Sequence, residues 1–118
     1  MNIEREIFEE LNRLGVPANL RGRDYIETAI ELLMNVPGMG QQITRKLYPS
    51  VAKQYDTTPN RAERAIRHAV EVSWERGDPD TLRAYFGHTV RPTIKPTNSE
   101  YLCMVARRLA MRIDEGEG

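Results

Sequence analysis

One stretch in the middle of the chain carries side chains that can recognise base pairs and phosphate groups. If it is helical, each residue advances by about 100°. One side of its first three turns then collects Arg61, Arg64, Arg67 and His68, with Glu63 at the margin. Arginine donates two hydrogen bonds from a planar fork to guanine O6 and N7, and glutamate accepts one from cytosine N4. Arg61, Glu63 and Arg64 therefore suit a DNA site that contains a C·G step.

The opposite side of the same stretch is largely apolar, as expected of a helix packed on a core. Its residues are Ala62, Ala65, Ile66, Ala69, Val72 and Ser73. Further along, Glu71 and Glu75 share the outer side, where DNA phosphates would repel them. We therefore predict that only the N-terminal half of this helix enters a groove of DNA, which leaves its far half free for another partner.

The charged side also has a simpler interpretation, which is a solvated helix surface. Glu63 and Arg67 are four residues apart, the spacing of a helical ion pair that contributes ~0.3 kcal/mol to stability. Under this interpretation the chain is a helical protein-interaction module that does not bind DNA.

Several polar side chains near this stretch could contact phosphates without reading the sequence. Arg67 and His68 lie at the end of the basic side, and Thr44, Lys46 and Lys53 flank the preceding helix. We predict that the DNA backbone is contacted by Arg67, His68, Thr44 and Lys46.

The residue types in the sequence do not indicate a catalytic site or a metal site. His68 and Glu71 are three residues apart and could share a metal, but nothing else supplies the remaining ligands. Cys103 is the single cysteine, which excludes a disulfide framework and a cysteine-rich zinc site and fits a small apolar residue of a core. No nucleophile with a base, no paired carboxylates and no phosphate loop can be assembled. We therefore predict a protein that is not an enzyme and needs no metal or cofactor.

Length and composition describe one ordinary domain. The chain of 118 residues suffices for a single core, and we predict one helical domain over residues 1–118. The net charge is zero, but acids gather at both ends, so residues 11–113 hold 16 basic and 10 acidic groups, a net charge of +6 that suits a polyanionic partner. No apolar run approaches the ~20 residues that cross a bilayer, and the start lacks a signal-peptide pattern. We expect a cytoplasmic protein without a membrane segment.

Hydrophobic periodicity and helix signals predict an all-α fold. The expected helices run over about 3–14, from behind Asp24 to 35, from Pro49 to 55, from Pro59 to 76, from Pro79 to 86, and over about 97–113. Pro49 is expected to interrupt the helical pattern that begins near Ile43, which leaves a turn before it. The residues from His88 to Pro96 should be irregular or extended, and Thr97 with Glu100 forms a capping-box pattern.

The helices at 49–55 and 59–76 have the spacing of a helix-turn-helix. Thr58 is the expected N-cap, and Pro59 suits the first helical position, where its missing N–H costs nothing. Ala52 is small enough to let two helices cross closely. The expected buried contacts between them are Val51, Tyr55, Ala62 and Ala65. We predict a helix-turn-helix over about 49–76, although short helical hairpins also occur as plain structural elements.

The stretch TTPNRAERAIRHAVEVSWERGD resembles the C-terminal effector domain of the sporulation stage-zero response regulator, the master transcription factor of endospore formation. The likeness continues through LGVPANLRGRDYIETAI, ITRKLYPSVAKQY, YFGHTV and KPTNSEYLCMVARRL, and covers roughly Leu11 to Leu109. It departs at Ala62, where the family commonly has valine. The family's N-terminal receiver domain has no counterpart in this sequence, so phosphorylation control is not expected within the chain.

The resemblance implies a six-helix transcription-regulator domain whose fourth helix reads a TGTCGAA-like box in the major groove. It implies two copies that associate in tandem on double-stranded DNA. The family's base-reading positions fall on Arg61, Glu63 and Arg64, with Arg67 and His68 at or near the DNA backbone.

The resemblance also implies a second partner, the sigma factor of RNA polymerase. The family's surface for it maps to Gly77, Thr81, Phe86 and Val90. The alternative to a DNA-reading domain is a helical module that docks on the transcription machinery through the region 74–86 without touching DNA. An equal loss of binding to cognate and scrambled DNA in Arg64→Ala would count against sequence reading, and binding that does not respond to salt would favour that alternative.

Overall fold

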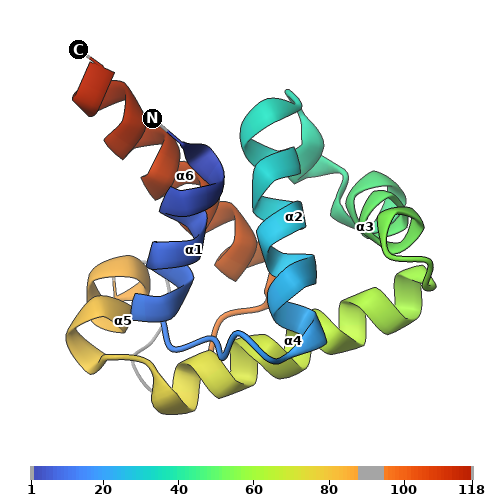
Figure 1. Ribbon diagram of the computed structural model, residues 1–118, viewed down its shortest axis with the longest axis horizontal. Helices are drawn as coiled ribbons and strands as arrows, with labels where there is room; N and C mark the ends of the chain where they lie inside the picture. Colours follow the sequence, from blue (N-terminus) through green and yellow to red (C-terminus); the bar gives the residue numbers. More distant parts are fainter. Residues whose placement is uncertain (1, 88–94, 118) are drawn as a thin grey trace.

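The computed structural model describes residues 2–87 and 95–117, and within them the chain forms six α-helices, two short helical turns and no strand (Figure 1). The elements in chain order are α1 (Ile3–Arg13), α2 (Arg21–Asn35), the 3₁₀ turn η1 (Met39–Gln41), the π turn η2 (Ile43–Leu47), α3 (Tyr48–Gln54), α4 (Pro59–Arg76), α5 (Pro79–Phe86) and α6 (Asn98–Glu117). The prediction of an all-α, six-helix fold is confirmed. None of the helices in these described segments is long and apolar enough to cross a membrane.

α2 is the central helix, and it packs against α1, α3, α4 and α6. In Figure 1 it stands between α1 and α6 on one side and α3 on the other, while α4 crosses beneath it along the lower edge. The three helices that meet at the centre contribute fully buried side chains: Ile26, Ala29 and Ile30 from α2, Ile66 and Ala69 from α4, and Leu102, Val105 and Leu109 from α6. The position of α4 is therefore set chiefly by α2.

The backbones of α2 and α4 touch where the two helices cross. Gly22, at the start of α2, is buried against Ala65 of α4, and a Cβ at this position would overlap the Ala65 carbonyl oxygen. Ala69, one turn further along α4, also faces the glycine. Only a residue without a side chain allows this approach, so Gly22 fixes the distance between the two helices.

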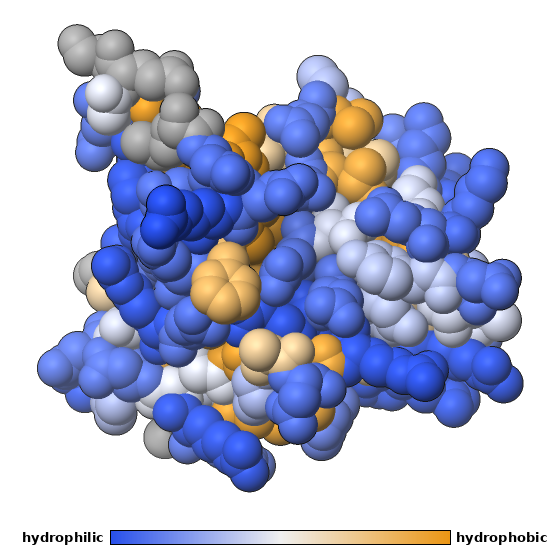
Figure 2. All heavy atoms as spheres, viewed as in Figure 1, coloured by the Kyte–Doolittle hydropathy of each residue, from blue (hydrophilic) through white to orange (hydrophobic). Residues whose placement is uncertain are grey.

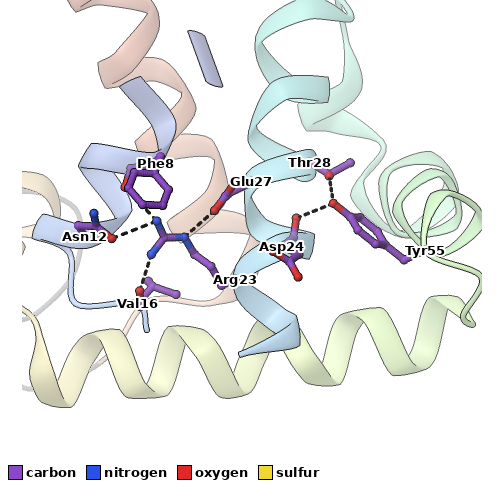
Figure 3. A network of polar contacts seen from close by, with 8 residues as sticks. All are labelled: Phe8, Asn12, Val16, Arg23, Asp24, Glu27, Thr28 and Tyr55. Atoms are coloured by element: carbon purple, nitrogen blue, oxygen red, sulfur yellow. Dashed lines mark hydrogen bonds and ion pairs between the residues drawn. The ribbon is translucent and has the colours of Figure 1, made fainter. Parts of the chain in front are cut away.

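Next to this glycine, Arg23 carries a buried charge that joins α1, the α1–α2 loop and α2 (Figure 3). Only 1% of the residue is exposed, yet every nitrogen of its guanidinium has a partner. Nη1 donates to the Val16 carbonyl (2.5 Å), Nη2 donates to the Phe8 carbonyl (2.9 Å) and Asn12 Oδ1 (3.1 Å), and Nε donates to Glu27 Oε1 (2.7 Å). Full pairing is what makes a buried charge tolerable. Sequence patterning gave no sign of it, because arginine is normally a surface residue.

A second buried charge, Glu10, joins α1 to α5 and α6. The residue is 2% exposed, accepts a hydrogen bond from Tyr85 of α5 and lies 2.8 Å from Arg112 Nη1 of α6. Burial by itself would raise the pKa of the Glu10 carboxyl, but the hydrogen bonds from Arg112 and Tyr85 and the charge of Arg112 outweigh burial and lower it. Glu10 is therefore ionised at neutral pH.

The ends of α1 and α4 meet through a third polar contact. Ser73, in the last turns of α4, is fully buried and donates to the Leu14 carbonyl (2.5 Å), while Tyr101 of α6 lies 2.6 Å from its hydroxyl. Gly15 follows in the left-handed conformation (φ +78°), which ends α1 as expected. This contact holds the C-terminal end of α4 against α1 and α6.

The helix-start signals in the sequence are confirmed by the structure. Thr58 accepts a hydrogen bond from the Arg61 amide at the start of α4, and Asp78 accepts one from the Thr81 amide at the start of α5. Before α6, Thr97 and Glu100 form the reciprocal capping box, with distances of 3.0 and 3.1 Å.

Two predicted boundaries were wrong. α2 begins at Arg21, three residues earlier than Asp24, because the chain leaves its extended conformation at Leu20. The turn expected before Pro49 is instead the helical turn η2, which continues directly into α3. In η2 the Leu47 amide bonds to the Gln42 carbonyl five residues earlier, and the proline then occupies the first turn of α3. A proline in a first helical turn removes no necessary donor.

We predict that Gly22→Ala lowers the free energy of unfolding by about 2 kcal/mol, because the added methyl group forces α2 and α4 apart. Urea denaturation measures the change. Gly40→Ala is the matched control, since a Cβ there would meet Cys103 Sγ at an ordinary 3.5 Å. Equal stability of the two variants would contradict the close crossing.

We predict that Arg23→Met lowers the free energy of unfolding by about 3 kcal/mol, because the Val16 and Phe8 carbonyls lose their buried donor. The control is Arg21→Met on the same helix, where the side chain is exposed. Thermal and urea unfolding of both variants measure the difference in stability. An unchanged free energy of unfolding in Arg23→Met would show that the hydrogen bonds of Arg23 do not stabilise the fold.

Candidate nucleic-acid interface

α3 and α4 pack as the predicted helix-turn-helix. Val51 and Ala52 of α3 and Ala62 of α4 are all buried, as expected from the sequence. The predicted burial of Ala65 was wrong: the residue is only half-buried, and it is its backbone carbonyl that meets Gly22 of α2. Their connection is tight: Asp56 adopts the left-handed conformation (φ 52°), and the Thr57 amide bonds to the Ala52 carbonyl (2.9 Å).

The predicted burial of Tyr55 between α3 and α4 was wrong. The residue is 37% exposed, and its hydroxyl lies 2.7 Å from Thr28 Oγ1 and donates to the Asp24 carbonyl, both on α2 (Figure 3). Its ring also lies 5.0 Å from that of Tyr25. Tyr55 therefore ties the turn of the helix-turn-helix to α2, at a second place besides the glycine crossing.

The predicted division of α4 into two faces is confirmed in outline: Ala62, Ile66, Ala69 and Ser73 are buried on the inner face as expected. The placement of Val72 was wrong, because Val70 is the buried valine and Val72 is half-buried. The outer face of α4 exposes the basic residues Arg61, Arg64, Arg67 and His68. Strongly hydrophilic side chains cover the lower right of the molecule in Figure 2, where Figure 1 places the N-terminal end of α4. The guanidinium groups can therefore reach a partner without any rearrangement of the core.

Glu63 and Arg67 form the ion pair that the simpler interpretation expected. Glu63 Oε1 lies 3.5 Å from Arg67 Nη1, and the two side chains are 32% and 53% exposed. Such a pair contributes little to stability. The carboxylate keeps a second oxygen that can accept a hydrogen bond, so the pair orients Glu63 and does not prevent base recognition.

Asn98, at the start of α6, holds α3 and α4 together from the outside. Its side-chain amide donates to Tyr48 Oη of α3 and to the Glu63 carbonyl of α4, each at 3.2 Å. Burial raises the pKa of the Tyr48 hydroxyl, which therefore stays protonated at neutral pH. No local sequence pattern indicates this contact, because the partners lie 35 and 50 residues away from Asn98.

The side chains that flank α3 and could contact phosphates lie at the surface of the molecule. Thr44 and Lys46 of η2 and Lys53 of α3 are exposed. Thr44 shares a groove with Glu63 and Arg67, between η2, the outer side of α4 and the start of α6. The structure therefore brings Thr44 together with the charged face of α4.

The residues mapped to a sigma-factor surface differ in their contacts and burial. Thr81 bonds to the N-cap Asp78, and Gly77 packs against the Leu14 carbonyl with no room for a side chain. Phe86 is 1% exposed and stacks on Tyr101 with ring centroids 5.2 Å apart, so its ring belongs to the core rather than to the surface. Val90 lies outside the described residues.

Within residues 2–87 and 95–117, no group of three or more histidine, cysteine, aspartate or glutamate side chains could hold a metal ion. Cys103 is a free, half-buried cysteine that lies near Gly40. Within the described residues, the charged surface that the fold presents most clearly is the basic outer face of α4.

Comparison with protein families agrees with this geometry. Residues 7–109, which include the complete helix-turn-helix, match the family described as sporulation initiation factor Spo0A C terminal. The chain belongs to this family. It is accordingly a DNA-binding, transcription-regulating effector domain of sporulation initiation, in a family of transcription factor domains rather than of enzymes. The resemblance found in the sequence is confirmed.

We predict that Asn98→Ala weakens both the fold and DNA binding by this Spo0A C-terminal domain. Loss of the two hydrogen bonds should lower the free energy of unfolding by about 1–2 kcal/mol, because the Glu63 carbonyl loses its donor. Arg107→Ala, an exposed residue on the same helix but outside this contact, is the control. Chemical denaturation measures the free energy of unfolding, and DNA titration measures the Kd. If both are unchanged in Asn98→Ala, Asn98 does not hold α3 and α4 together.

Proposed function

We propose that α4 reads a TGTCGAA-like box from the major groove of double-stranded DNA. In this proposal Arg61 and Arg64 donate to guanine, and Glu63 accepts from cytosine. The observation that carries it is the two-faced packing of α4: the inner face is buried against α2 and α3, while the arginines of the first turns are exposed on the outer face. Family membership supports DNA binding, and the residue types support the C·G step.

Flanking contacts in this proposal go to the DNA backbone. Arg67 and His68 follow the base-reading residues along α4, and Thr44 and Lys46 approach from η2. Contacts from both the recognition helix and the preceding element fix the register of a helix-turn-helix on its site. The net positive charge of residues 11–113 favours the same partner.

We further propose that the junction of α4 and α5 contacts the sigma factor of RNA polymerase. Of the four residues mapped to this surface, Gly77 and Thr81 lie at the junction, Phe86 supports it from the core, and Val90 follows in sequence. A hollow at this junction is lined by Trp74, Glu75, Pro79, Leu82 and Arg83. Two copies are proposed to associate in tandem on DNA, and the domain is proposed to act in the cytoplasm.

We predict that Arg64→Ala weakens binding to the box by about 1–3 kcal/mol and relaxes the preference at one base pair, because a bidentate contact to guanine is lost. Fluorescence anisotropy with the box and with single-base variants measures both effects. Arg107→Ala on α6, an exposed arginine away from α4, is the matched control and should bind as the unaltered chain does.

The outcome on scrambled DNA separates the two candidate functions. A domain that reads sequence loses affinity for the box in Arg64→Ala while its weak binding to scrambled DNA changes less. Equal losses on both duplexes would contradict base reading by Arg64. Absence of salt-dependent binding to any duplex would instead favour a module that docks on protein alone.

A further inference from the structure

Lys95, just before α6, reaches across to the outer side of α4. Its Nζ lies 2.6 Å from Glu71 Oε1, and the two side chains are 43% and 42% exposed. Glu71 is one turn beyond Arg67 and three residues beyond His68, on the side proposed to face DNA. From the sequence alone this glutamate is expected to repel phosphates, and its partner lies 24 residues away, where no local pattern indicates a contact.

The pair changes the charge of the groove beside α4. This groove is lined by Thr44, Glu63, Arg67, Lys95, Thr97 and Ser99 among others. Arg67 offsets Glu63 at 3.5 Å, and Lys95 offsets Glu71 at 2.6 Å. Without Lys95, an unpaired carboxylate would stand next to the phosphates that approach Arg67 and His68. The hydrogen bond and the charge of Lys95 also lower the pKa of Glu71, so the carboxylate stays ionised and the pair persists at neutral pH.

We propose that Lys95 is a further DNA-binding determinant, which acts by neutralising Glu71 and so extends the usable surface of α4 into its fourth turn. The inference rests on the proposed reading of DNA by α4. Lys95 acts on affinity through Glu71, without contacting a base. Its effect is electrostatic, so it is largest at low salt and declines as salt screens the carboxylate.

The test compares Lys95→Ala, Glu71→Gln and the double variant on a duplex with a TGTCGAA box, by anisotropy at several salt concentrations. Lys95→Ala should raise the Kd by about three- to tenfold at low salt, with an unchanged Tm because an exposed pair adds little stability. The double variant should regain the affinity of the unaltered chain, since it lacks the repelling charge. Arg5→Ala, which breaks an exposed pair with Glu9 on α1, is the matched control and should have no effect.

Each result has one consequence. Restored binding in the double variant supports neutralisation. Unchanged binding in Lys95→Ala overturns the proposal, and so does a double variant as weak as Lys95→Ala, which would indicate a direct phosphate contact by Lys95 instead. Arg64→Ala, measured in parallel, distinguishes these failures from failure of the proposed function: if it also binds normally, α4 does not read the box.

Discussion

The direct contact between the backbones of α2 and α4 is the constraint on which the rest of the structure depends. Gly22 admits the Ala65 carbonyl to a distance that any side chain would prevent. The crossing places the inner face of α4 against the central helix and turns the outer face, with its arginines, toward solvent. Tyr55 adds a second tie, from the turn before α4 back to α2. Both ties lie along the N-terminal half of α4, the half that is proposed to meet DNA.

Buried charges hold α1 against its neighbouring helices. Arg23 joins α1 and its following loop to α2, and Glu10 joins α1 to α5 and α6. Each is fully partnered, so the cost of burying it is offset by directional hydrogen bonds. Such hydrogen bonds form only at definite distances and angles, whereas apolar packing alone does not require a definite geometry. The domain thus has an ionic scaffold around α1, separate from the exposed charges on α4.

Charge pairing on the outer face of α4 has a different purpose from charge pairing in the interior. The pairs Glu63–Arg67 and Glu71–Lys95 are exposed and add little to stability. They matter because they change the charge that the surface of α4 presents to a polyanion. In the proposed mode of DNA binding, Glu63 accepts a hydrogen bond from a base, whereas Glu71 would only repel phosphates. Neutralisation of Glu71 by Lys95 would then lengthen the surface of α4 that can face DNA.

The sequence by itself determined the features that depend on neighbouring residues: six helices, the caps at Thr58 and Thr97, and the two faces of α4. Helical periodicity and capping are local, so a single stretch of chain contains all the information they need. Only the tertiary structure decided that Arg23 is buried, that Tyr55 bonds to α2, and that Lys95 pairs with Glu71. These contacts join residues far apart in the chain, and their partners are chosen by how the helices cross, which no local pattern records.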